Sequence, residues 1–263
     1  MHTECEYKLV LANGAFKSGS TWLREIVKHL RRFDPIPEAY ASRRLPHWIR
    51  EERIERFLND HSMKCVCLSK SHIYLPEVIR KLRKHRNIRV LNIKRDIRDV
   101  VVSAYYHYKR TSEREIGFSE YYWRIGRFKA HEVMEYNQNW SADDGAILFT
   151  EYESLKKDFH AEVAKIALFL GIEASDERIG RIQEKTSIEN LRKSRGEEAL
   201  EEGSRFFRKG VIGDWKNHFS EDELKDVANI EESGLAGVSY IKYWCGFPMR
   251  RRALRFKQRL FQK

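Results

Sequence analysis

The segment 13–22, NGAFKSGSTW, combines one lysine with small and hydroxylated residues directly after an apolar run. Its glycines permit a tight turn, its consecutive backbone N–H groups can surround an anion, and the N-terminus of a following helix adds partial positive charge. A Walker loop carries its lysine directly after the second glycine, but here Ser20 takes that place and Lys17 precedes Gly19. The segment therefore predicts an anion-binding loop unlike that of an ordinary nucleoside triphosphatase. The alternative is a plain turn between a strand and a helix.

Two basic side chains, Lys70 and His72, follow the second apolar run, 64–69. A histidine at the end of a parallel strand can face the loop that follows the neighbouring strand. Because a neutral imidazole accepts a proton readily near neutral pH, His72 is a candidate general base for an acceptor hydroxyl. A histidine on the surface or at a helix cap is the alternative interpretation.

A further pair of polar side chains follows the third apolar run, which ends at Lys94. Arg95 at the strand end and Ser103 two helical turns later can hold one phosphate by charge and by a hydroxyl donor. Asp96 adds a negative charge that Lys94 or Arg98 can offset. The alternative is a helix that begins at Asp96 as N-cap, with an incidental serine.

The segment 206–217, FFRKGVIGDWKN, places two cations directly before a glycine. A glycine-kinked loop of this kind can offer Arg208, Lys209 and the N–H of Gly210 to a phosphate. A charged loop that caps a helix would use the same residue types, so spacing alone leaves that interpretation open.

Taken in order, these segments resemble the motifs of the PAPS-dependent cytosolic-type sulfotransferases, where PAPS is 3′-phosphoadenosine 5′-phosphosulfate. KSGSTW resembles the 5′-phosphosulfate loop, SKSHIYLP the element with the catalytic histidine, and RDIRDVVVSAYY and RKGVIGDW the 3′-phosphate elements. Two weaker likenesses, FTEYESL and TSI, correspond to segments beside the adenine. The resemblance implies that the nucleotide is bound by Lys17, Ser18, Gly19, Ser20, Thr21, Trp22, Arg95, Ser103, Tyr152, Thr186, Ile188, Arg208, Lys209 and Gly210.

The resemblance also implies a reaction, the transfer of a sulfuryl group from PAPS to a hydroxyl or amine with release of PAP (adenosine 3′,5′-bisphosphate). His72 is then the general base, and Lys17 stabilises the charge that develops on the leaving oxygen. Lys70 adds positive charge near the transferring group, and Ser103 keeps Lys17 idle until the acceptor arrives. No metal is expected, because protein cations match the charges of the donor.

The chain departs from the family pattern in several places, among them Ser20 for the first threonine of the loop and Asp96 for an asparagine. Phe16 stands where the family has a proline, and Ile188 stands where it has a stacking phenylalanine. Two additional residues, Ile73 and Tyr74, separate His72 from the following Leu-Pro pair, so the acceptor side is expected to differ in geometry.

Four short apolar runs alternate with helical patterns along the chain. The runs 7–12, 64–69, 88–94 and 146–150 have strand length, and the helical period after the fourth runs up to Gly171. This alternation predicts an α/β, P-loop-like fold of three layers, in which helices flank a central parallel sheet. Ligands bind such sheets at the carboxyl ends of the strands, where the polar segments lie.

The 263 residues, of which 41% are hydrophobic, suit a single domain over 1–263. No run reaches the roughly 18 apolar residues of a membrane span, and no secretion signal is recognisable, so the cytoplasm is the expected location. The segment 192–204 is either a solvated loop or a mobile flap over the nucleotide. The basic tail 249–263 is either a surface helix or a contact with an anionic surface.

The net charge of +11 indicates anionic partners without choosing among them. A P-loop kinase and a nucleic-acid-binding protein are the competing classes, and the displaced lysine argues against the first. We expect a small-molecule, glycan or lipid acceptor and no nucleic acid, with the oligomeric state left open.

Overall fold

The computed structural model describes residues 7–234, except 44, 113–114, 142–144 and 146. Its four strands form one parallel sheet in the order β2 (Cys67–Ser71), β1 (Leu9–Gly14), β3 (Ile88–Lys94) and β4 (Ile147–Glu151). All four predicted strands are therefore confirmed. β1 and β2 each continue two residues beyond the apolar run. The added residues, Asn13 and Gly14 in β1 and Lys70 and Ser71 in β2, are not apolar but still pair within the sheet. The tail 249–263 lies outside the described residues.

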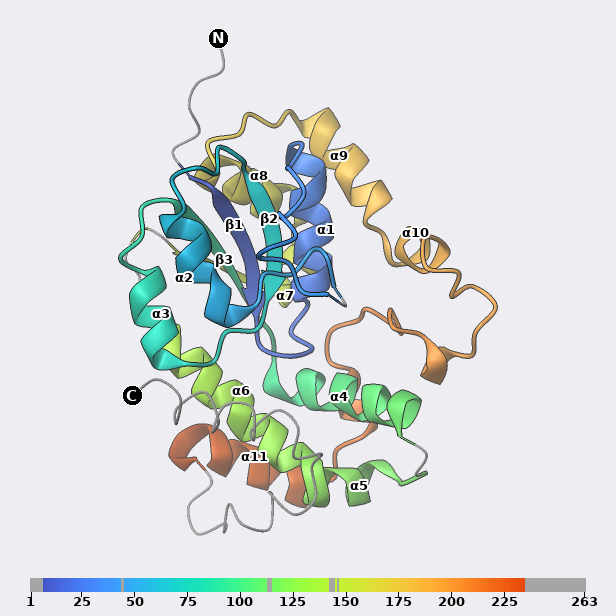
Figure 1. The fold of residues 1–263 in the computed structure, drawn as a ribbon. Helices are drawn as coiled ribbons and strands as arrows, with labels where there is room; N and C mark the ends of the chain where they lie inside the picture. The colour runs from blue at the N-terminus through green and yellow to red at the C-terminus, as the bar shows by residue number, and fades with distance from the viewer. Residues whose placement is uncertain (1–6, 44, 113–114, 142–144, 146, 235–263) are drawn as a thin grey trace.

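One face of the sheet is covered by α1 (Ser20–Leu30), α8 (Phe159–Phe169) and α9 (Asp176–Lys185). Val10 and Ala12 of β1 point to this side, where they pack with the apolar faces of those helices. Packing in this layer fixes α1, the helix that follows the loop after β1 (Figure 1).

The opposite face is covered by α2 (Glu51–Asn59), α3 (Pro76–Leu82), α4 (Ile97–Thr111) and α6 (Arg127–Asn139). Leu9 and Leu11 of β1 belong to this second core. α5 (Phe118–Tyr121), the π-helical turn η1 (Tyr122–Gly126) and α11 (Glu221–Ser233) pack beyond α4 and α6 (Figure 1). The predicted arrangement of a sheet between two helical layers is confirmed.

The helix predicted up to Gly171 is interrupted near its start. It consists of α7 (Tyr152–Lys157) and α8, because the side chain of Asp158 accepts a hydrogen bond from the N–H of Ala161 and begins a new helix. Gly171 ends α8 with φ +63°, and the N–H groups of Gly171 and Ile172 bond to carbonyls of the last turn. α7 begins at Tyr152, directly after the last residue of β4.

The remaining elements run along the carboxyl edge of the sheet. They are α10 (Ile188–Lys193) and two short 3₁₀ turns, η2 (Glu202–Ser204) and η3 (Asp214–Asn217). Within 7–234, apart from the gaps named above, no helix has the length and apolar character that a bilayer span requires.

Candidate active site

The loop between β1 and α1 turns through two left-handed residues. Lys17 has φ +72° and Gly19 has φ +108°, and α1 begins at the next residue. A Cβ on Gly19 would lie 2.8 Å from the ring of Tyr152, so both the conformation and the contact require glycine there. The hydroxyl of Ser18 is buried and donates to the carbonyl of Ala15 at 2.7 Å. Ser18 therefore closes the turn of the loop from inside.

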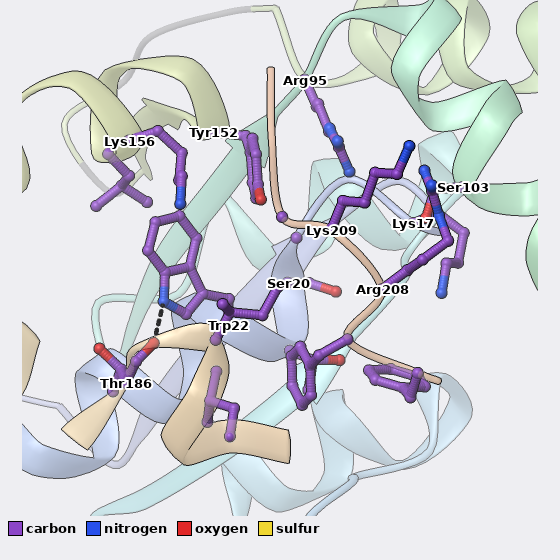
Figure 2. Close-up of a pocket in the computed structure, with 18 of the residues that line it drawn as sticks. Lys17, Ser20, Trp22, Arg95, Ser103, Tyr152, Lys156, Thr186, Arg208 and Lys209 are labelled. Atoms are coloured by element: carbon purple, nitrogen blue, oxygen red, sulfur yellow. Dashed lines mark hydrogen bonds between the residues drawn. The ribbon is translucent and has the colours of Figure 1, made fainter. Parts of the chain in front are cut away.

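A cavity of about 380 Å³ opens where the carboxyl ends of the strands meet the segment 206–211. Every residue predicted for the site lines this cavity except Ser18. Figure 2 shows Arg95, Ser103, Lys17, Lys209 and Arg208 gathered at one side of the cavity, with the side chains of Trp22 and Lys156 at the other.

His72 lies beside the first loop, as its place at the end of β2 predicted. Its Nδ1 is 2.6 Å from the carbonyl oxygen of Gly14. Since a carbonyl only accepts hydrogen bonds, we assign the ring proton to Nδ1, which leaves Nε2 as the nitrogen able to take a proton. The rings of Phe16 and Trp48 contact the imidazole edge-on and restrict its rotation.

The two additional residues after His72 attach β2 to the first loop. The N–H of Ile73 donates to the side-chain oxygen of Asn13 at 3.2 Å, and the hydroxyl of Tyr74 accepts from the N–H of Phe16 at 3.0 Å. The departure from the family pattern thus supplies contacts that hold the loop.

Both predicted lysines have lowered pKa values. Burial, followed by the charges of Arg110 and other nearby cations, lowers the pKa of Lys17 to about 7. Burial, followed by the charges of Arg24 and Arg195, lowers the pKa of Lys70 to about 8. Crowded and desolvated cations of this kind gain most from an anionic ligand.

Arg208 and Lys209, on the segment after α10, are paired with carboxylates. Arg208 forms ion pairs with Asp214 and Glu202, and Lys209 lies 3.1 Å from Asp214. Burial opposes ionisation of Asp214, but hydrogen bonds from Arg208 hold the pKa of this carboxyl well below its ordinary value. The guanidinium of Arg95 lies over the ring of Tyr152, 4.2 Å from the ring centroid. These pairs hold the cations in fixed orientations.

Asp96 has both of the roles considered for it. Its side chain accepts from the N–H of Arg98 and so caps α4, and it also pairs with the guanidinium of Arg98 at 2.5 Å. Arg98 therefore offsets the negative charge, whereas the ammonium of Lys94 lies over the ring of Phe149.

The far end of the cavity is aromatic. The indole N–H of Trp22 donates to the carbonyl of Thr186 at 3.0 Å, and the rings of Trp22 and Tyr152 meet edge-on at 5.3 Å (Figure 2). Gly210, with φ +65°, approaches so closely that a Cβ there would lie 2.6 Å from Ile188 and 3.6 Å from the hydroxyl of Tyr152. The narrow space bounded by Trp22, Tyr152 and Ile188 suits a flat ring.

The structure adds lining residues that sequence reasoning did not assign, above all His107, Phe206 and Phe207. The only signal for the two phenylalanines was their place next to Arg208. The segment 192–204 is more than a solvated loop, because its Glu197 is buried and accepts from the backbone N–H groups of both phenylalanines.

The sulfotransferase domain family matches residues 9–239 of the chain. The chain belongs to the sulfotransferase family. Sulfotransferase 1C2 of Oryctolagus cuniculus is 27% identical over 249 residues, covering 85% of this chain and 81% of that protein. Sulfotransferase 1E1 of Mus musculus is 28% identical over 229 residues, covering 78% and 76%. The resemblance predicted from the motifs is thereby confirmed, and with it a PAPS-dependent sulfotransferase enzyme by family.

Solved structures of the family share the fold. Mouse sulfotransferase SULT7A1, complexed with PAP, has a TM-score of 0.62 at 22% identity and covers 88% of this chain and 85% of its own. Retinol dehydratase, in complex with androsterone and inactive cofactor PAP, has a TM-score of 0.62 at 21% identity and covers 88% and 82%. At these identities the likeness establishes the three-layer architecture.

Proposed function

We propose that the protein transfers a sulfuryl group from PAPS to a hydroxyl or amine of a small acceptor, with His72 as general base. The observation that carries the proposal is a single cavity that joins the loop lysine Lys17 to the clamp of Arg95, Arg208 and Lys209. A nucleotide with a phosphosulfate and a separate 3′-phosphate requires both sets of cations. PAP, which two solved relatives hold, has the same adenosine and both phosphates.

The donor is placed by three groups of residues in this proposal. Lys17, Ser20, Thr21 and the loop N–H groups hold the 5′-phosphosulfate. The 3′-phosphate is held by a wall of cations and donors, namely Arg95, Ser103, Arg208, Lys209 and Gly210. The adenine is enclosed by Trp22, Tyr152, Thr186 and Ile188, where the aliphatic Ile188 covers one face of the base with less stacking energy than a phenylalanine would.

The reaction is an in-line displacement at sulfur. An acceptor lone pair forms the new bond to sulfur while the bond from sulfur to the bridging oxygen breaks, and the electron pair of that bond leaves on PAP. The acceptor proton passes to Nε2 of His72. Lys17 stabilises the charge on the departing oxygen, and Lys70 stabilises the transferring group. Ser103 lines the same cavity, consistent with its proposed restraint of Lys17.

No metal enters this mechanism. Among residues 7–234, outside the stated gaps, no group of three or more histidine, cysteine or acidic side chains is arranged to hold a metal ion.

We also keep a single domain over 1–263 and a cytoplasmic location as predictions. A contact of the basic tail with an anionic surface is a prediction of the same kind.

A thermal-shift comparison of PAP, Mg²⁺-ATP and a single-stranded oligonucleotide tests the proposal. A ligand at 100 times its Kd adds about 2.7 kcal/mol of stability, so PAP should raise Tm by roughly 5 °C or more for a chain of this size. Arg208→Gln should reduce the shift, whereas Lys193→Gln, an exposed change on α10, should preserve it. A larger shift with Mg²⁺-ATP would favour a kinase, and salt-sensitive stabilisation by the oligonucleotide alone would favour a nucleic-acid-binding protein.

A further inference from the structure

Three cations surround the ring of Phe206, which lines the cavity. The ammonium of Lys17 and the guanidinium of Arg195 each lie 4.6 Å from its centroid, and the guanidinium of Arg110 lies 5.4 Å away. No two of these charged groups can therefore be more than about 10 Å apart. Arg110 and Arg195 belong to none of the segments that the donor requires.

The cations around Phe206 have few acidic partners compared with the clamp cations Arg95, Arg208 and Lys209. Arg195 pairs with Glu197 at 2.9 Å. Arg110 donates to a backbone carbonyl, that of Arg205, and to Nδ1 of His107, and it forms no ion pair with a carboxylate in the described part of the chain. By contrast, carboxylates accompany every clamp cation: Asp99 beside Arg95, and Asp214 with Glu202 beside Arg208 and Lys209.

This difference leaves an excess of positive charge around Phe206, at the margin of the cavity. Lys17, Lys70, Arg110 and Arg195 meet one carboxylate, Glu197, among the residues that the structure describes. The phosphosulfate of the donor brings one negative charge on its phosphate and one on its sulfate. A cation therefore remains unmatched when the donor is bound.

A continuous wall connects these arginines to the proposed base. The ring of Phe16 contacts His72 edge-on at 5.8 Å and His107 edge-on at 5.1 Å. Because a guanidinium only donates, the contact of 2.8 Å from Arg110 leaves Nδ1 of His107 unprotonated, with the ring proton on Nε2. Along this wall a molecule can reach both His72 and the cations around Phe206.

We propose, building on the function proposed above, that the acceptor is a hydroxyl compound that also carries an anionic group. Its hydroxyl lies at His72, and its carboxylate, sulfate or phosphate lies over the rim of Phe206 against Arg110 and Arg195. Both guanidinium groups lie within about 10 Å of the ammonium of Lys17, a span that suits a small hydroxy acid. Arg110 and Arg195 are specificity-determining residues in this proposal.

Calorimetry on PAP-saturated protein tests the proposal with pairs that differ only in charge. The probes are 4-hydroxyphenylacetate with its methyl ester, and galacturonate with its methyl ester. In at least one pair the acid should bind about tenfold tighter than the ester, since one well-placed charge pair is worth roughly that factor. Arg110→Gln and the more exposed Arg195→Gln should each reduce this preference to about threefold or less. Lys109→Gln, the same charge change at the neighbouring exposed position of α4, should leave it intact.

Each outcome decides between the two proposals. If the protein does not bind PAP in the first titration, the proposed function fails. If PAP binds but no acid binds more tightly than its ester, only the anionic acceptor is wrong. The anionic-acceptor proposal would also be overturned if the preference for the acid survived in both arginine variants. The same holds if Arg110→Gln lost as much affinity for PAP as for the acid.

Discussion

The buried carboxylate of Asp99, on α4, accepts a hydrogen bond of 2.8 Å from the backbone N–H of Gly213, which lies 114 residues further along the chain. The same carboxylate accepts from the N–H of Trp215 at 3.0 Å. Asp99 thus fastens the loop that carries Arg208 and Lys209 to the helix that carries Ser103. Together with the hydrogen bond from Arg95 to the carbonyl of Val211, this side chain holds the two halves of the proposed 3′-phosphate clamp together.

Replacing Asp99 with asparagine should weaken PAP binding. An amide has one acceptor oxygen, so one of the two backbone N–H groups would face an NH₂ donor, a loss of about 1–3 kcal/mol. Calorimetry should show a PAP Kd raised by roughly tenfold or more. Asp222→Asn, at an exposed position of α11, should bind PAP as the unaltered protein does. An unchanged Kd in Asp99→Asn would mean that the loop does not depend on this contact.

His72→Gln should remove turnover while the donor still binds. Glutamine can donate to the carbonyl of Gly14 but cannot take the acceptor proton, and a general base contributes about 10²–10⁴-fold to rate. The measurement is transfer from labelled PAPS over a panel of hydroxylated acceptors, with PAP affinity from calorimetry alongside. His160→Gln, an exposed position on α8, is the control. Normal turnover in His72→Gln would exclude this histidine as the base.

Gly210→Ala and Gly196→Ala should separate backbone strain from crowding. Both glycines have φ +65°, but a Cβ at Gly196 meets nothing within 4 Å, whereas one at Gly210 meets Ile188 at 2.6 Å. Urea unfolding should show a loss of about 1–2 kcal/mol in each variant from the left-handed conformation. Only Gly210→Ala should also weaken PAP binding, by about tenfold. Equal PAP affinities in the two variants would contradict the close approach of Gly210 to the nucleotide.

The ligand-free protein should become more stable as the pH rises from 7 to 9. Burial, followed by nearby cations, lowers the pKa of Lys17 from 10.5 in the unfolded chain to about 7. Between these values the unfolded state binds more protons than the folded state, so the free energy of unfolding increases with pH. The contribution is up to about 2 kcal/mol over these two pH units.

Urea unfolding at pH 7, 8 and 9 measures this effect against Lys17→Met. The variant lacks the ammonium, so its stability should change less with pH than that of the unaltered protein. Parallel pH profiles for the two proteins would show that Lys17 keeps an ordinary pKa. Lys70→Met should behave in the same direction, since the pKa of Lys70 is lowered to about 8.

Local patterns were sufficient to predict the sheet and the segments that form the cavity. Each strand is a short apolar run, a helical period follows three of the four, and the carboxyl ends of parallel strands necessarily meet at one edge. Strand ends were less predictable, because Asn13 and Ser71 are polar yet still pair within β1 and β2. The residue roles assigned from the resemblance, including that of His72, stay predictions.

Long-range partners could not be predicted in the same way. Asp99 lies near the start of the helix that follows the third apolar run, but the reason for its burial is a backbone segment more than 100 residues away. Phe206 has an apolar side chain, and nothing in its immediate neighbourhood indicates that Lys17, Arg110 and Arg195 surround it. Such features arise only when the segment after α10 folds back over the sheet.

Lys17 has the only positive φ of a non-glycine residue in the described part of the chain. Its left-handed backbone is strained and its ammonium is desolvated, so this one residue lowers the stability of the folded protein in two ways. Glycine there would relieve both at once. A library selected for heat resistance alone would therefore favour glycine at position 17, yielding a sturdier fold that has lost its cation. Efforts to increase the thermal stability of this protein should therefore leave Lys17 unchanged.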